Sequence, residues 1–288
     1  MHVSFQPPTN TPQDATKPRK VLVTGAAGRI GSAFAAAARD DYELTLMVQN
    51  VDAERSLAIK PHGRLVEGRL EDIERLKELC AGIDTVVHLA ADPSPSATWD
   101  SLHANNIIGT YHLLAAAKAA GCRRVILASS IHTVSGYPSE QQVKTHDPVN
   151  PEDLYGVSKC FGEAMGRYMA EREQLSCIAL RIGWFTSAES IRKEHSPHGL
   201  EAWLSPRDFM QLLKLCIENT SLKFAVFNAI SDNRFKRLDI SDARELLGYA
   251  PKDDAFAEHE AIQTETLPDT KAETPPINRK TSGLRNEL

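Results

Sequence analysis

A tyrosine and a lysine stand four positions apart in the segment YGVSK at 155–159, a spacing that makes two side chains neighbours on one helix face. A free tyrosine, with a pKa of about 10, is a weak base at neutral pH. An adjacent ammonium favours the phenolate, so Tyr155 and Lys159 together predict an acid–base catalyst. Ser130 ends the apolar run RRVILASS, where its hydroxyl could polarise the same substrate oxygen. A Tyr–Lys spacing also arises by chance, and the pair is weak evidence by itself.

A glycine-rich turn follows the first apolar run. The segment TGAAGRIG at 24–31 stands directly after VLV and directly before an alanine-rich stretch, with glycines at 25, 28 and 31. A pyrophosphate group needs a tight turn, a close backbone approach and a helix N-terminus aimed at it, and glycines in this position supply the first two. The alternative is a plain turn between a strand and a helix.

The elements that would position these residues alternate along the chain. Expected strands lie at 21–25, 43–48, 84–90, 123–130, 177–183 and 223–230, and expected helices at 34–38, 109–120, 151–173, 205–217 and 241–247. This β-α-β-α order predicts the α/β class, a doubly wound parallel sheet with helices on both faces. Consecutive apolar residues in VVHLA predict strands that are covered on both sides. We expect one domain over 20–252, with a small C-terminal substrate lobe drawn from about 183–250.

Composition narrows the class of protein. The 288 residues are 42% hydrophobic and 25% charged, and the net charge of −5 argues against nucleic acid or a membrane surface as a partner. Apolar runs fall short of the roughly 18 to 20 residues that span a bilayer, and we expect a cytoplasmic protein. Five scattered cysteines predict neither a disulfide framework nor a metal site. The stretches 1–19 and 253–288 lack an apolar period and are expected to be disordered tails.

Five motifs occur in the order of a known family. TGAAGRIG, HLAA at 88–91, NIIGT at 106–110, ASS at 128–130 and YGVSK resemble the extended short-chain dehydrogenase/reductases, the NAD-dependent epimerase/dehydratase group. ASSIHTVSGYP, LYGVSKCFGE and LRIG are similar to uronate dehydrogenases, and HLAADPSPSATWDS and AWLSPRD to short-chain glucose-6-phosphate and sulfosugar dehydrogenases. The resemblance implies a Rossmann fold, NAD or NADP as cofactor, and oxidation of an aldose at C1 to the lactone. A homo-oligomer is compatible with it.

The resemblance also implies roles for individual residues. Those implied for catalysis are Ser130, Tyr155 and Lys159. Those implied for the cofactor are Gly25, Ala27, Gly28, Arg29, Ile30, Gly31, Gln49, Asn50, Arg69, Leu70, Leu89, Ala90, Ala91, Asn106, Tyr155, Lys159 and Ile182. Those implied for the sugar are Ser94, Ser130, His132 and His198. For Asn106 and His132 a purely structural role is the alternative, and for Ser94 and His198 a solvated loop.

Departures from the family pattern leave two questions open. Gln49 and Asn50 replace the acid that usually ends the second strand, and Arg69 replaces the usual aspartate after the third. Ile131 and Trp184 replace polar residues of the uronate enzymes, which puts uronate itself in doubt. A nucleotide-sugar epimerase or dehydratase is therefore the alternative within the fold. A non-catalytic NAD(P)-binding sensor is the alternative from another class.

Overall fold

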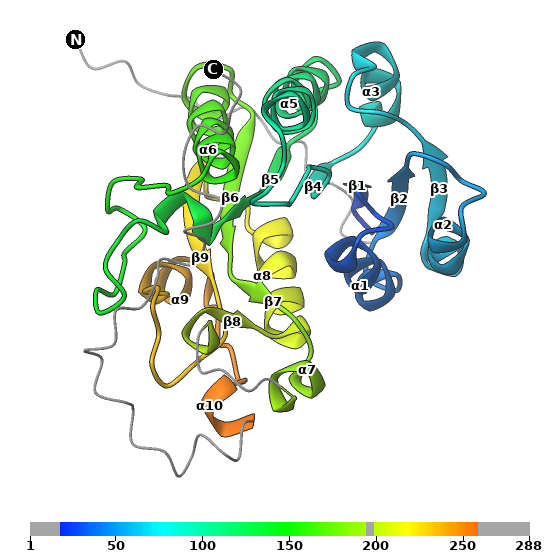
Figure 1. Ribbon diagram of the computed structural model, residues 1–288. Coiled ribbons are helices and arrows are strands. Elements are labelled where there is room, and N and C mark those ends of the chain that lie inside the picture. Colours follow the sequence, from blue (N-terminus) through cyan, green and yellow to red (C-terminus); the bar gives the residue numbers. More distant parts are fainter. Residues whose placement is uncertain (1–17, 194–198, 259–288) are drawn as a thin grey trace.

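The computed structural model describes residues 18–193 and 199–258, and its centre is a parallel seven-stranded sheet (Figure 1). The strand order is β3-β2-β1-β4-β5-β6-β9, and every neighbouring pair runs parallel. The strands are β1 (Lys20–Thr24), β2 (Glu43–Val48), β3 (Arg64–Glu67), β4 (Thr85–His88), β5 (Arg124–Ser130), β6 (Ser176–Ile182) and β9 (Phe224–Ala229). The predicted doubly wound parallel sheet is confirmed.

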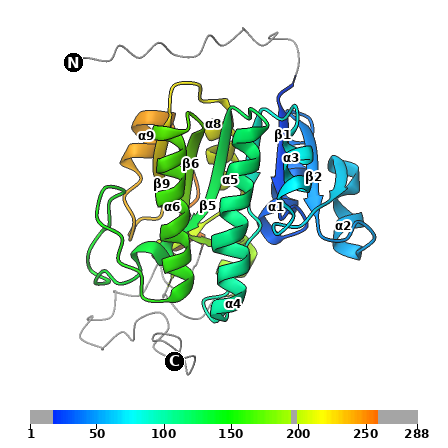
Figure 2. The same ribbon diagram turned by 90° about the horizontal axis from the view of Figure 1, so that it is seen from above.

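Helices cover both faces of this sheet. The longer ones are α1 (Arg29–Ala38), α3 (Ile73–Cys80), α5 (Gly109–Ala119), α6 (Leu154–Arg172) and α8 (Pro206–Glu218). Helices α3, α5 and α6 lie over one face and α1 and α8 over the other (Figure 1), and α5 and α6 run side by side (Figure 2). The shorter helices are α2 (Glu54–Ile59), α4 (Trp99–Leu102), α7 (Ala188–Arg192), α9 (Ser241–Leu247) and α10 (Ala255–Glu258). None of the described helices is long and apolar enough to cross a membrane.

The central strands are continuously apolar because alternate side chains enter two different cores. Val86 and Val125 pack in the core beneath α3, α5 and α6, whereas Val87 and Ile126 pack in the core beneath α1 and α8. All four side chains are at most 1% exposed. Four of the five cysteines are likewise buried, as expected of small hydrophobes, and Cys160 is half-buried.

The range 183–250, expected to form a small lobe, divides between two parts of the fold. Helix α8 and strand β9 belong to the main sheet and its covering layer. Beyond the sheet stands a separate pair of short parallel strands, β7 (Trp184–Phe185) and β8 (Trp203–Leu204). Within this range the apolar run of β9 adds a strand to the main sheet and the apolar side of α8 covers one face of that sheet.

Both expected tails need correction at their inner ends. Arg19 pairs with Asp84 at 3.3 Å and with Glu218 at 3.1 Å. At the other end, residues 255–258 form α10, and Phe256 is 5% exposed beside the fully buried Trp203. The prediction of a tail from residue 253 was wrong here, because two apolar residues in a charged stretch find a hydrophobic partner. The remainder of both tails lies outside the described residues.

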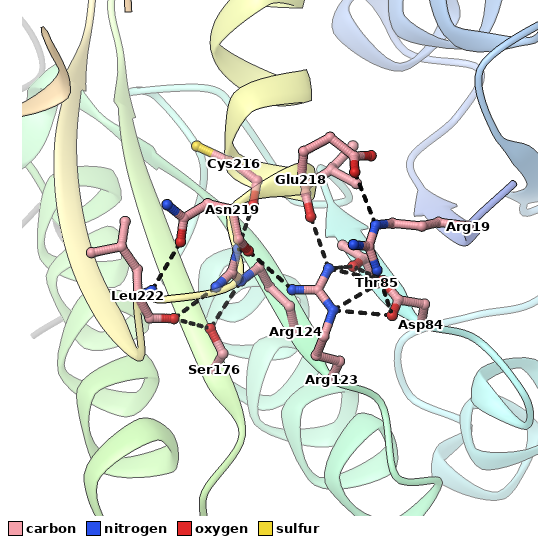
Figure 3. Close-up of polar contacts among 11 residues, drawn as sticks. Arg19, Asp84, Thr85, Arg123, Arg124, Ser176, Cys216, Glu218, Asn219 and Leu222 are labelled. Carbon is pink, nitrogen blue, oxygen red and sulfur yellow. Dashed lines mark hydrogen bonds and ion pairs between the residues drawn. The ribbon is translucent and has the colours of Figure 1, made fainter. Parts of the chain in front are cut away.

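A polar network fastens the end of α8 to the amino ends of the central strands (Figure 3). Arg124, 1% exposed, donates to the backbone carbonyls of Cys216 at 2.6 Å, Leu222 at 2.7 Å and Asn219. Neighbouring Arg123 bonds the Ile217 carbonyl at 2.8 Å and pairs with an aspartate at the start of β4. Carbonyls at a helix C-terminus lack intrahelical partners and favour a positive charge, so these two arginines complete α8.

Candidate active site

The turn after β1 and the turn after β4 meet at the carboxyl edge of the sheet. The amide of Leu89 donates to the Thr24 carbonyl at 3.2 Å, and the Ala90 amide to the Thr24 hydroxyl at 3.2 Å. Gly25 has a φ of 67°, and a Cβ built on it would lie 2.8 Å from the Ala90 nitrogen. Only glycine fits this position. The glycine turn and the HLAA segment, both implied for the cofactor by the resemblance, are therefore in direct contact.

The start of α1 forms a cradle suited to an anion. Gly28 is the N-cap residue and supplies no side-chain cap, and the first turn contains no acidic residue. A Cβ on Gly31 would lie 2.5 Å from the Gly25 carbonyl oxygen, so the turn packs tightly on the helix. The first amides of a helix have no intrahelical acceptor and carry a partial positive charge. Such a cradle fits the pyrophosphate of NAD(P).

The structure brings Ser130, Tyr155 and Lys159 together at the same carboxyl edge of the sheet as this turn. Ser130 is the last residue of β5, and Tyr155 and Lys159 lie on the first turns of α6. The Ser130 hydroxyl accepts from the His132 amide at 3.2 Å and lies near enough to the Tyr155 phenol to lower its pKa. Lys159 Nζ lies 5.5 Å from the centre of the Tyr155 ring and donates to the Ala128 carbonyl at 2.9 Å.

The electrostatics of the pair differ from the expectation for an adjacent ammonium. Burial raises the pKa of Tyr155 to about 12, the Ser130 hydroxyl opposes this rise, and the carboxylates of Asp153 and Asp92 add to it. Burial lowers the pKa of Lys159 to about 8. Among the groups that act on the Tyr155 pKa, the Ser130 hydroxyl is the one that favours the phenolate.

A buried ion pair fixes α6 against the strands that carry the site. The Arg181 guanidinium donates twice to Glu163, from Nε at 2.9 Å and Nη2 at 2.9 Å, and the Ser129 hydroxyl donates to the same carboxylate at 2.6 Å. Arg181 is 2% and Glu163 8% exposed. Because Glu163 lies one turn beyond Lys159, this pairing fixes the position of α6 along β5 and β6.

Two of the predicted substrate residues have clear local settings. His132 Nδ1 lies 2.7 Å from an oxygen of Asp153, and its ring packs edge-on against Tyr155 with 5.3 Å between ring centres. Ser94 lies in the loop after β4, where its amide donates to Asp92 Oδ1 at 3.0 Å. His198 lies outside the described residues.

Asn106 holds the loop after β4 against α6. Its Oδ1 accepts from the Asp92 amide at 2.8 Å, and its Nδ2 donates to the Asp92 carbonyl at 3.0 Å and to the Ser158 hydroxyl at 2.9 Å. The residue is 2% exposed. Both amide hydrogens are thus engaged by the protein, which favours the structural role over direct cofactor contact.

The residues expected at the adenosine end lie at the carboxyl ends of β2 and β3. Gln49 is exposed, and Asn50 Oδ1 accepts from the Asp52 amide at 2.8 Å. Arg69 is exposed and lies 3.9 Å from a Glu71 oxygen. Leu70 is 8% exposed and packs in the core under α3 and α5. Leu70 therefore packs in the core beneath the candidate site. The ends of β2 and β3, at Gln49, Asn50 and Arg69, offer no carboxylate to the adenosine ribose.

The other predicted cofactor residues surround the first turn and its neighbours. Arg29 is exposed and its Nη1 donates to the Phe185 carbonyl at 3.4 Å. Ile182 ends β6 beside Ser130 in the sheet register and is 9% exposed. Ala27, Ile30 and Ala91 are each half-buried, in the turns after β1 and β4 or on the first turn of α1.

Residues 21–205 match the model of the NAD dependent epimerase/dehydratase family. This match covers the glycine turn, the loop after β4 and the Ser–Tyr–Lys group. The chain belongs to this family. Within it, an L-arabinose 1-dehydrogenase (NAD(P)(+)) of Haloferax volcanii is 34% identical over 82% of this chain and 97% of the relative. An NAD-dependent glucose-6-phosphate dehydrogenase of the same organism is 32% identical over 82% and 94%.

Solved structures of family members agree with the fold. A uronate dehydrogenase from Agrobacterium tumefaciens superimposes with a TM-score of 0.76 at 32% identity, covering 88% of this chain and 92% of that protein. A variant of the same enzyme in complex with NAD gives a TM-score of 0.75. A Rossmann-type sheet and a nicotinamide cofactor are therefore properties of this family. The turn before α1 has the form that such a cofactor requires.

Sequence reasoning missed two acids of the site. Asp153 caps α6 by accepting the Gly156 amide at 2.6 Å and also holds His132, and Asp92 anchors the loop after β4. The signal for Asp153 was available, because an aspartate directly before a helix is a favoured N-cap residue. Its pairing with a histidine from another segment was not visible in the sequence.

Proposed function

We propose that this family member is an NAD(P)-dependent sugar dehydrogenase that oxidises the anomeric C1 hydroxyl of an aldose to the lactone. The observation that carries the proposal is the placement of Ser130 at the end of β5, with Tyr155 and Lys159 on the first turns of α6, at the same carboxyl edge of the sheet as the glycine turn. The names of the relatives support it, since they act on arabinose, glucose 6-phosphate and uronates.

Each residue of the site has a defined task in this reaction. Tyr155 takes the proton of the C1 hydroxyl, and Ser130 holds the oxygen and favours the tyrosinate. Lys159 holds the nicotinamide ribose, and the cradle of α1 holds the pyrophosphate. When bound, NAD(P) supplies the acceptor for the hydride that leaves C1.

A substrate panel tests the proposal. Neutral aldoses, aldose 6-phosphates and uronates are each offered with NAD and with NADP, and formation of reduced cofactor is followed by its absorbance. A dehydrogenase reduces the cofactor in bulk. An epimerase converts a nucleotide sugar without net reduction, and a sensor binds cofactor without turnover of either kind, so these two outcomes overturn the proposal.

Replacement of the base tests the assignment of residues. Tyr155→Phe is expected to lower turnover by roughly 10² to 10⁴ while cofactor binding persists. Tyr168→Phe is the matched control, because Tyr168 lies on the same helix and is 49% exposed. Equal activity of the two variants would exclude Tyr155 as the base.

A further inference from the structure

His132 is held by a buried carboxylate at the edge of the candidate site. The Nδ1 atom lies 2.7 Å from Asp153 Oδ2, with the histidine side chain 17% exposed and the aspartate side chain 5% exposed. The two residues come from different segments, His132 from the turn after β5 and Asp153 from the residue before α6. The pair therefore joins the two elements that carry Ser130 and Tyr155.

Asp153 is the accepting partner in this contact. Burial by itself would raise the pKa of Asp153, but hydrogen bonds from His132 and from the Gly156 amide lower it below its ordinary value. An ionised carboxylate accepts hydrogen bonds and cannot donate one. The hydrogen between the two side chains must then reside on His132 Nδ1.

The other ring nitrogen faces open space near the tyrosine. Nε2 has no hydrogen-bond partner in the part of the chain that the structure describes, and it is not among the fully buried unpaired atoms there. His132 also lines a small cavity with Ala202, Arg237 and Leu238, and the lining of that cavity does not include Tyr155. In a neutral imidazole with its hydrogen on Nδ1, Nε2 carries a lone pair and accepts a hydrogen bond.

The backbone around His132 is held by its neighbours. The His132 amide donates to the Ser130 hydroxyl at 3.2 Å. A Cβ built on Gly156 would lie 2.4 Å from the His132 carbonyl oxygen, so the first turn of α6 packs directly on this residue. These contacts fix the backbone of His132, while Asp153 and the Tyr155 ring orient the imidazole.

We propose that Asp153 is a positioning residue that holds His132 as the acceptor for one hydroxyl of the substrate sugar. The inference rests on the proposed function and refines it, because a hydroxyl can donate to Nε2 whereas a carboxylate or a doubly ionised phosphate cannot. The position beside Tyr155 therefore selects a hydroxyl-bearing carbon, and any anionic substituent of the sugar lies elsewhere.

Asp153→Asn separates this role from helix capping. The amide oxygen of asparagine still accepts the Gly156 amide, whereas its NH₂ group donates to His132 Nδ1 and forces the hydrogen onto Nε2. Asp153→Ser is the matched control, since serine keeps a cap but cannot reach the imidazole. Equal melting temperatures of Asp153→Asn and wild type establish that the cap is retained.

Nitrogen-15 NMR reads the tautomer without any turnover. The His132 resonances are assigned by their absence in His132→Gln. The wild type is expected to show the Nδ1–H tautomer at the pH of the assay, and Asp153→Asn the Nε2–H tautomer. An imidazolium or an Nε2–H form in the wild type overturns the proposal, whatever the enzyme does with sugars.

Deoxy sugars test the proposed hydrogen bond between a sugar hydroxyl and His132 Nε2. The best aldose of the panel is compared with its 2-, 3- and 4-deoxy analogues, and we expect the wild type to lose at least about tenfold in kcat/KM for one of them. In Asp153→Asn the parent sugar loses a similar factor, mainly through KM, while that analogue changes little. If Asp153→Asn loses kcat/KM equally for the parent sugar and for the analogue, the role of Asp153 is merely structural. If no aldose is oxidised, the proposed function fails, and the NMR result alone then decides the state of His132.

Discussion

Lys159 Nζ donates to the Ala128 carbonyl oxygen at 2.9 Å and lies 5.5 Å from the centre of the Tyr155 ring, one turn earlier on α6. The lysine is thus held by the end of β5 rather than by the phenol. Burial lowers its pKa to about 8, so its positive charge opposes folding. The buried Lys159 ammonium therefore destabilises the fold at the position where the nicotinamide ribose is expected to bind.

Lys159→Met is predicted to stabilise the fold and to abolish activity. A folded-state pKa of about 8, below the ordinary 10.5, means that the unfolded chain binds more protons between these pH values. The penalty is full below about pH 8 and is lost as the pH rises towards 10.5. We expect a gain of about 1 to 3 kcal/mol in the free energy of unfolding at pH 7.

The gain from Lys159→Met should shrink towards alkaline pH in denaturant titrations. Lys193→Met serves as the control, since the Lys193 side chain is 74% exposed and should show no such dependence. A destabilised Lys159→Met at neutral pH would contradict the interpretation.

Arg124→Met is predicted to be among the most destabilising single changes. It removes a guanidinium from three backbone carbonyls and from the Ser176 hydroxyl at 2.9 Å, and leaves these acceptors buried. We expect a loss of about 3 kcal/mol or more, measured as a lower urea midpoint. Arg39→Met, whose side chain is 50% exposed, should change the midpoint little. The network lies at the opposite edge of the sheet from the site, so KM of the folded fraction should be unchanged.

Phe256→Ala tests whether α10 is part of the folded core. Phe256 is 5% exposed and packs edge-on against Phe235 with 5.1 Å between ring centres. Truncation of a buried phenylalanine costs about 3 to 5 kcal/mol, and the lower end is expected for this peripheral cluster. Leu57→Ala, at a side chain 48% exposed, is the control. Identical melting temperatures for the two variants would mean that α10 contributes nothing to stability.

Gln49→Asp is predicted to sharpen the preference for NAD. A carboxylate at the end of β2 bonds the adenosine ribose hydroxyls and repels the 2′-phosphate of NADP, and neither Gln49 nor Asn50 can repel it. The wild type should therefore discriminate against NADP by less than about 10³-fold in kcat/KM, equivalent to about 4 kcal/mol.

Asn50→Asp provides the comparison for cofactor choice. The Asn50 side chain accepts a hydrogen bond from the Asp52 amide, and Asn50→Asp should keep that contact. Asn50→Asp should therefore discriminate between NAD and NADP less strongly than Gln49→Asp. A wild type that already rejects NADP more strongly would reveal an acid elsewhere in the site.

The local patterns of the sequence determined the class of fold and pointed to the candidate catalytic group. Helical and strand periods, the GxxGxxG turn and the Tyr–Lys spacing each depend on neighbours a few positions apart, and a parallel sheet brings the carboxyl ends of its strands to one edge. Gly25, Ser130 and Tyr155 could therefore be placed together before any coordinates were known.

Tertiary structure alone decided which polar groups are paired. The strand order β3-β2-β1-β4-β5-β6-β9 differs from the order in the chain, and it brings His132 to Asp153, Arg181 to Glu163 and Asn106 to the loop after β4. The same packing buries Phe256 within a charged stretch and moves the pKa of Lys159. Hydrogen bonding, burial and desolvation depend on distances between segments remote in the chain, and no spacing within a single segment encodes them.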